Sequence, residues 1–212
     1  MPCKSGAFGF HFITSIMENN RSFSAEQSLQ VIQSMIEKAK QDVASNSFYL
    51  LLWGWLIFIA AVLHFILMKF TGFEYPYLAW NLMWIGAIVS MIKGIKDSKK
   101  TVVKTFVGET MKYFGISQII LYSGLIFVFG KYDLWHVSFP FYILMYAVAC
   151  FFMGALLQFP LLKWTGLLCL PIIVVTMYAS FEWQLLLLAL AILISYIIPG
   201  HVLHSKEKLQ NK

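Results

Sequence analysis

Charge is scarce in this sequence. Only 12% of the 212 residues are charged and 59% are hydrophobic, whereas a soluble globular chain has about 25% charged and about 45–50% apolar residues. A chain with half the usual charge cannot cover a water-facing surface. The composition therefore argues against a soluble domain. It predicts an all-α integral membrane protein, because a helix of ~20 apolar residues crosses the ~30 Å hydrocarbon core of a bilayer.

Cysteine is also scarce, and its spacing contains no metal or redox motif. Of the three cysteines, Cys3 lies at the start of the chain, and Cys150 and Cys169 lie inside apolar runs. No CxxC pair occurs, so we expect neither a disulfide framework, nor structural zinc, nor thioredoxin-like chemistry. We interpret Cys150 and Cys169 as small buried hydrophobic residues.

The common motifs of catalysis and nucleotide binding are missing. The sequence contains no HExxH, GxSxG, GxxxxGK[ST] or GxGxxG, which removes support for intramembrane proteolysis, P-loop hydrolysis and dinucleotide chemistry. The apolar segments contain almost no charge, as a cost of about 2.5–3.5 kcal/mol for a mid-bilayer Asp or Lys requires. This argues against a proton pump that uses buried carboxylates. We expect a non-enzymatic protein without a cofactor.

Long apolar segments set the predicted topology. From Leu161 to His201 the apolar character is almost unbroken, and at 1.5 Å per residue this stretch is roughly 60 Å long, twice the hydrocarbon core. It must contain two helices, with the turn expected at Phe181–Gln184 and the end of the second helix at Pro199-Gly200. The bundle is expected over residues 48–203. Its six predicted spans are 48–69, 76–92, 113–130, 136–157, 161–180 and 183–201.

Small residues in the second span predict close helix packing. Gly86, Ser90 and Gly94 recur every four residues and therefore lie on one face of a helix. Such small-xxx-small ridges let two helix backbones approach closely within a membrane.

The distribution of lysine and arginine predicts the orientation. With the N-terminus in the cytoplasm, 14 of the 16 basic residues lie on the inner side, and only Lys69 and Lys131 lie outside. This asymmetry predicts an inner-membrane protein with both termini cytoplasmic and a basic cytoplasmic tail at 204–212. The basic residues cluster in alternate loops rather than on one folded face, so we expect the lipid bilayer, and not nucleic acid, as the partner.

Residues 24–47, before the first span, are predicted to form an amphipathic helix from Ser24 to about Ala44 and then a break. Ser24 and Gln27 form a capping-box pattern, and residues 44–47 are expected to break the helix. The polar face is not rich in Lys and Arg, as a lipid-surface helix would be. We therefore expect a protein contact: with its own bundle, with a cytoplasmic partner chain, or with a second copy in a homo-oligomer. The residues expected to face this partner recur at spacings of three and four: Leu29, Ile32, Ile36, Ala39 and Val43.

The first residues of the chain do not form a convincing targeting signal. Lys4 precedes a short apolar run that His11 interrupts, and no small-x-small cleavage site follows. We predict a disordered leader over residues 1–23 and a natural start at Met17.

Two segments resemble a known group of proteins. FYLLLWGWL at 48–56 and LLLLALAILISYIIPGHVL at 185–203 resemble a family of uncharacterised bacterial multi-pass inner-membrane proteins, found chiefly in the Bacteroidetes. The resemblance runs from Met17 to about Ser205 and includes the short helix before the first span. It implies the membrane location and the start at Met17. The family has no known activity, so the resemblance implies no catalytic residue.

A cluster of polar residues is predicted on the outer side. Each outer loop contains one carboxylate, and two histidines lie near them in the predicted topology. Carboxylates and imidazoles could together bind a divalent cation or a polar substrate. The alternative is that these residues are solvated ends of loops. The five residues are Glu74, Asp133, His136, Glu182 and His64.

These observations leave two main hypotheses for function. The first is a non-enzymatic interaction or regulatory component of the inner membrane that presents the amphipathic helix to another protein. The second is a small transporter or cation-binding protein that uses the outer cluster. A membrane enzyme comes third, because no nucleophile and base pair is recognisable.

Overall fold

The computed structural model describes residues 25–100 and 106–210, with side-chain surroundings for Gln30, 47–96 and 108–206. The chain divides into two units, residues 1–41 and 42–212. In its described residues the chain is 93% helical and contains no strand, which confirms the predicted all-α class. The predicted leader at 1–23 lies outside the described residues.

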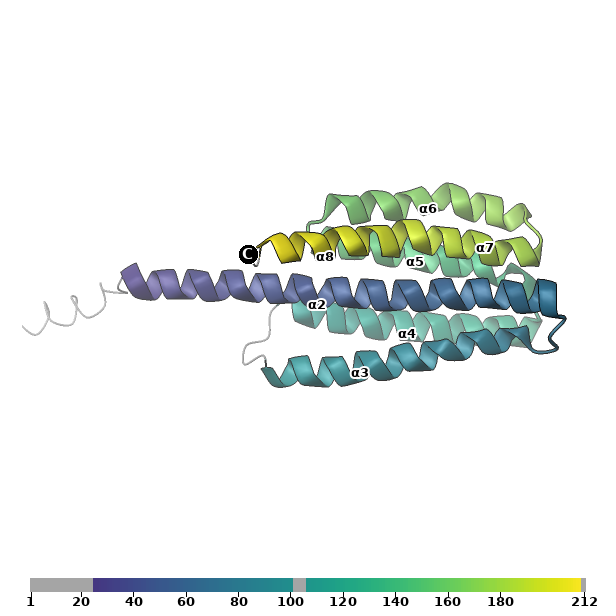
Figure 1. The fold of residues 1–212 in the computed structure, drawn as a ribbon, viewed down its shortest axis with the longest axis horizontal. Helices are drawn as coiled ribbons and strands as arrows, with labels where there is room; N and C mark the ends of the chain where they lie inside the picture. Colours follow the sequence, from purple (N-terminus) through teal and green to yellow (C-terminus); the bar gives the residue numbers. More distant parts are fainter. Residues whose placement is uncertain (1–24, 101–105, 211–212) are drawn as a thin grey trace, which may run out of the picture. The chain divides into compact units, whose positions relative to one another are not determined.

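The helices follow one another with short turns (Figure 1). Three turns, at 72–75, 133–134 and 179–180, lie at one end of the helices, which we call the Glu182 end; the turn at 157–159 lies at the other. The elements are α2 (Ala25–Ile66), π-helix η1 (Leu67–Thr71), 3₁₀-helix η2 (Pro76–Asn81), α3 (Leu82–Lys100), α4 (Phe106–Tyr132), 3₁₀-helix η3 (Trp135–Val137), α5 (Ser138–Leu156), α6 (Pro160–Tyr178), α7 (Phe181–Ile192), π-helix η4 (Leu193–Ile197) and α8 (Ile198–Gln210).

Six helical segments in the described residues are long and apolar enough to cross a membrane. Each predicted span overlaps one of them, and every predicted boundary falls within five residues of the observed one. The largest differences arise where a helix continues beyond the predicted span, at 93–96, 108–112 and 202–206. The segments are Ser47–Thr71, Pro76–Lys96, Gly108–Tyr132, Trp135–Leu156, Pro160–Tyr178 and Phe181–Lys206.

The predicted break at 44–47 is wrong for the backbone, because α2 runs from Ala25 to Ile66 without interruption. The four residues are Ala, Ser, Asn and Ser. They interrupt the apolar pattern but include neither glycine nor proline. Ser and Asn cost only a few tenths of a kcal/mol relative to good helix formers, and helix propagation from both sides is cooperative.

The predicted turn at Phe181–Gln184 is also displaced. The turn lies two residues earlier, where Ala179 and Ser180 have extended backbone angles and Phe181 begins α7. Glu182 falls in the first turn of α7, where the positive end of the helix dipole favours a carboxylate.

The last span does not end at Pro199-Gly200, since α8 continues to Gln210. The predicted tail at 204–212 is therefore helical as far as it is described. Proline has no N–H to donate to the carbonyl four residues earlier, which here belongs to Ser195. That carbonyl lies within π-helix η4 and accepts a hydrogen bond from Cys150 Sγ at 3.0 Å instead. A side chain of α5 thus replaces the missing backbone donor.

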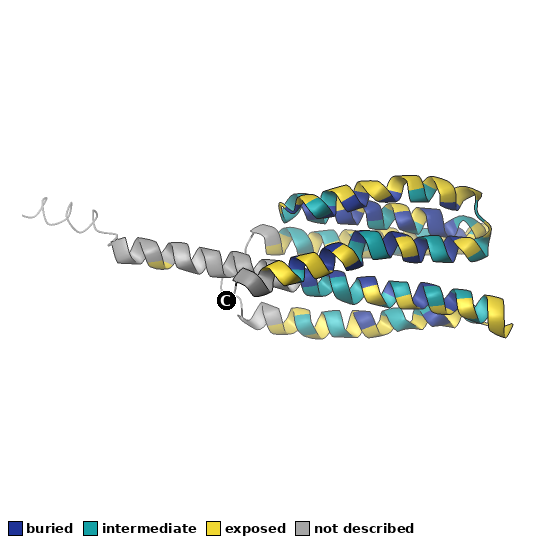
Figure 2. Cartoon of the chain, turned by 45° about the horizontal axis from the view of Figure 1, so that its top comes forward, coloured by how far each residue is buried: buried dark blue, intermediate teal, exposed yellow. Residues whose placement is uncertain are grey.

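Glycine allows close helix contacts within residues 42–212. A Cβ on Gly86 would lie 2.6 Å from Leu56 Cδ1, so at this position of the predicted ridge α3 packs tightly on a side chain of α2, whereas a Cβ on Gly94 would lie 3.8 Å from Tyr49 Oη, an ordinary contact. A Cβ on Gly154 would lie 2.6 Å from Lys163 N, and one on Gly166 would lie 2.9 Å from Ala147 O, which places α5 and α6 in backbone contact. Buried residues follow the facing sides of the helices, and exposed residues follow the outward sides (Figure 2).

Candidate functional site

The predicted outer cluster is not assembled. In the described part of the chain, no three His, Cys, Asp or Glu residues lie close enough together to hold a metal ion. Glu74, Asp133 and His136 are exposed. The other two members, His64 and Glu182, each contact a residue that is not a metal ligand of the predicted set. The sequence pattern located the polar ends of the helices correctly but not their partners.

His64 is buried in an aromatic contact between three elements. Its side chain is 5% exposed, and its Nδ1 lies 3.0 Å from Trp80 Nε1. Indole N–H can only donate, so His64 Nδ1 accepts this bond and carries no proton. The rings of Trp80 and Phe181 lie edge-on to the imidazole at centroid distances of 6.3 and 6.2 Å. His64 thus joins α2 to η2 and α7.

Glu182 is held by an ion pair at the same end. Lys69 Nζ lies 2.7 Å from Glu182 Oε2, which joins η1 to the first turn of α7. Both side chains are partly exposed, at 51% and 37%, so water screens the pair. These two contacts tie the first span to the second and to the last. At the Glu182 end, His64 and Glu182 therefore connect helices and are not arranged as ligands of a metal ion.

A second group of polar residues, which the sequence analysis missed, lies where α5, α6 and η4 meet. We call Cys150, Thr165, Cys169 and Ser195 the thiol–hydroxyl cluster; each is at most 5% exposed. Cys150 Sγ lies 3.0 Å from Ser195 O and 3.7 Å from Thr165 Oγ1. Cys169 Sγ donates to Thr165 O at 3.4 Å, and Ser195 Oγ donates to Ala191 O at 2.7 Å.

The side chains of this cluster donate hydrogen bonds to backbone carbonyls and do not form a nucleophile–base pair. Within the described residues, the hydrogen-bond partners of both thiols are carbonyl and hydroxyl oxygens, and none is the carboxylate or imidazole base that thiol catalysis needs. Hydrogen bonds of this kind between helices are typical of membrane interiors. The cluster fixes η4, whose π geometry leaves the Ser195 carbonyl available to Cys150.

Tyrosines continue this polar region along α5. Tyr146 packs on Tyr122 of α4 and on Tyr196 of η4, with ring centroids 5.7 and 5.8 Å apart. A sequence signal for the region did exist, because Tyr142, Tyr146 and Cys150 recur every four residues and so lie on one face of a helix.

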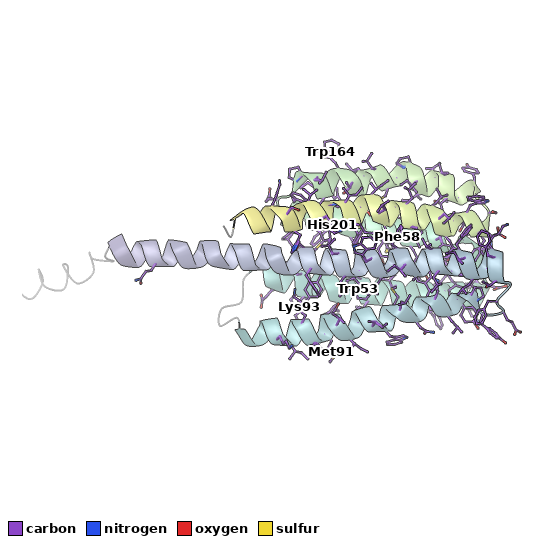
Figure 3. The ribbon with its side chains drawn as sticks, viewed as in Figure 1. Trp53, Phe58, Met91, Lys93, Trp164 and His201 are labelled. Atoms are coloured by element: carbon purple, nitrogen blue, oxygen red, sulfur yellow. The ribbon has the colours of Figure 1, made fainter. Side chains whose placement is uncertain are left out.

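Cation–π contacts lie at the end opposite to Glu182. Lys93 is labelled in Figure 3, and its Nζ lies 3.6 Å from the ring centre of Phe48 and 5.5 Å from that of Tyr49. Lys206 Nζ lies 5.0 Å from the ring centre of Phe159. All three distances are below 6 Å, which is typical of an attractive interaction between a cation and a ring face. These lysines link the ends of α3 and α8 to aromatic residues of neighbouring segments.

The residues predicted to face a partner lie in α2, where the backbone is helical. The side chains of Leu29, Ile32, Ile36, Ala39 and Val43 lie outside the described residues. Gln30, which the pattern assigns to the polar face, is exposed. The helix that the amphipathic pattern requires is therefore present, and the prediction that its apolar stripe contacts a protein stays a prediction.

Comparisons with known proteins gave no match. The chain matches no family model, no curated protein and no solved structure.

Proposed function

We propose that this chain is a non-enzymatic, six-span inner-membrane protein that presents the amphipathic part of α2, residues 25–44, to another protein chain. The observation that carries the proposal is the composition of α2 itself. One helix, Ala25–Ile66, contains a membrane-length apolar segment from Ser47 onward and, before it, a stripe of apolar residues at helical spacing. A stripe of this kind needs a protein surface to cover it.

Large apolar side chains on the outside of the helices support membrane insertion. Trp84, Ile119, Phe127 and Trp164 are between 67% and 75% exposed. Monomeric proteins in water rarely expose contiguous apolar patches of more than a few hundred Å², whereas lipid tails surround such side chains at no cost. Both termini are assigned to the cytoplasm because the basic residues gather at that side.

The contacts of the polar residues support a role without catalysis. His64, Glu182, Cys150 and Cys169, the groups best suited to chemistry, each contact a residue of a neighbouring element. These contacts weaken the alternative of an outer cation site, because two of its five candidate ligands have other partners. His64 accepts a hydrogen bond from Trp80, and Glu182 forms an ion pair with Lys69.

Membrane insertion and orientation are tested with reporters fused to the full chain. A reporter active only outside the cytoplasm should be active when placed in the loops near Glu74 or Asp133 and inactive at the C-terminus. A reporter active only in the cytoplasm should give the opposite result. Activity of the first reporter at the C-terminus would contradict the assigned orientation.

The interaction role is tested by purifying the full chain in mild detergent with its bound proteins. In one variant Ile32→Gln and Ile36→Gln disrupt the apolar stripe, and in a matched control Gln30→Ala and Ser34→Ala change its polar face. We expect the bound chain to be lost from the first variant and retained by the control. Equal recovery from both variants, or no bound chain with the wild type, would contradict the proposal.

A further inference from the structure

The apolar stripe of α2 has heptad spacing. Leu29, Ile36 and Val43 are separated by seven residues, as are Ile32 and Ala39. These are the a and d positions of a coiled coil, and the structure has an unbroken helix over all of them. Apolar residues at both a and d form the seam along which parallel helices of a coiled coil pack.

The continuity of α2 with the first membrane-length segment fixes how two copies would meet. Every copy inserted with the same topology has residues 25–46 on the same side of the membrane and at the same distance along α2 from Ser47. Two neighbouring copies therefore bring the same stripe residues together in parallel and in register. Confinement of both copies to one membrane also raises their effective concentration.

The flanking positions of this register contain no repulsive pair. In a parallel coiled coil each g residue faces the e residue of the following heptad on the other chain. Here Met35 at g faces Lys40 at e, and Ser28 at g faces Gln33 at e. The first pair contains one charged residue and the second contains none, so no like charges face each other and two identical chains can pair.

We propose that the occupant of the stripe is a second copy of this chain, with residues 29–43 paired as a parallel, in-register coiled coil; this rests on the proposed function and names its partner. The stripe covers little more than two heptads, and an isolated helix of this length is marginal in water. Pairing therefore depends on the membrane-embedded part of the chain. The test uses the full chain in its membrane.

Disulfide cross-linking in native membranes tests the register. In a Cys3→Ser background, Ile36→Cys places a thiol at position a and Ser34→Cys places one at position f, two residues away on the opposite face. The two native thiols of the bundle, Cys150 and Cys169, are 1% and 0% exposed and stay inert. On mild oxidation we expect a dimer band from Ile36→Cys that is several-fold stronger than that from Ser34→Cys.

Each other result has a defined meaning. Equal dimer yields at the two positions, or no dimer at either, would overturn the paired register. A cross-linked product of another mass from Ile36→Cys would show a different partner, which overturns this inference and leaves the proposed function standing. A second measurement uses two differently tagged copies of the chain. Their co-purification should be lost with Ile32→Gln and Ile36→Gln and kept with Gln30→Ala and Ser34→Ala.

Discussion

Glycine has opposite roles in the α5–α6 pair and in helix α4. In α5 and α6, a Cβ on Gly154 or Gly166 would lie within 3 Å of backbone atoms of the facing helix. In α4, a Cβ on Gly115 or Gly124 would have no other described atom within 4 Å. In the most apolar stretch of the α5 segment 39% of the residues are buried, and in that of the α4 segment 6% are buried. Glycine brings the first two helices together, while in α4 it leaves the surface open.

The difference shows that two kinds of packing hold these helices. Close backbone approach through small residues stabilises α5 against α6. Helix α4 is held through ring contacts instead: Phe114 stacks on Phe152 with centroids 4.5 Å apart, and Tyr122 packs on Tyr146. The first arrangement is sensitive to one added methyl group, and the second has room for it.

Alanine substitutions at glycine should give the largest effect and the clearest contrast. Gly166→Ala should lower the free energy of unfolding by about 1–3 kcal/mol, since overpacking forces backbone shifts. The control Gly124→Ala should leave stability unchanged or raise it by up to about 1 kcal/mol through helix propensity. The unfolding midpoint of the purified protein in detergent measures both. Similar midpoints for the two variants would break the comparison.

Substitutions at Cys150 test the polar contact within the well-packed region. Cys150→Val leaves the Ser195 carbonyl without its thiol donor and should cost about 1–3 kcal/mol, the usual penalty for an unsatisfied buried group. Cys150→Ser keeps a donor of similar size and should retain most of the stability. The same unfolding midpoint separates the two. If Val is tolerated as well as Ser, the contact between Cys150 and Ser195 does not stabilise η4.

A pair of tryptophans, one in η2 and one in α3, compares a partly buried position with an exposed one. Trp80→Phe removes the N–H that His64 accepts and should cost about 1 kcal/mol. Trp84, which is 71% exposed, offers the matched control, and Trp84→Phe should change stability by less than about 0.5 kcal/mol. Equal losses from both variants, measured by thermal unfolding, would mean that the hydrogen bond contributes nothing beyond ring packing.

The smallest effect is expected for the exposed ion pair. A double-mutant cycle with Lys69→Met and Glu182→Gln should give a coupling energy below about 1 kcal/mol, because water screens a pair of this exposure. Unfolding measured at low and high salt should show the coupling fall as salt rises. A larger coupling that salt does not change would mean that the pair is less solvated than its exposure indicates.

The sequence predicts the spans well because a run of apolar residues has to match the thickness of a bilayer. It also locates the ridge at Gly86, which contacts Leu56. It does not distinguish Gly166 from Gly124, because the difference lies in which helix is opposite. The contact between Lys69 and Glu182 joins residues 113 positions apart, and no local pattern reports it.

The end of the last span was mispredicted for a related reason. Pro199-Gly200 is a strong stop signal when only the local chain is considered. The donor that compensates for proline comes from Cys150, on another helix, and no local sequence pattern reports the π geometry of η4. Local rules failed where a tertiary contact replaced a backbone hydrogen bond.

Because Cys150 and Cys169 are buried, their reaction with a thiol reagent can report when the surrounding helices separate. Thiols react with alkylating reagents as thiolates and only when reagent and water reach them. In a Cys3→Ser background, the labelling rate would therefore measure how often α5, α6 and η4 separate in the intact membrane, without detergent and without an attached probe. Slow labelling of the wild type and faster labelling of Gly166→Ala would show that the close packing of α5 on α6 limits how often these helices separate.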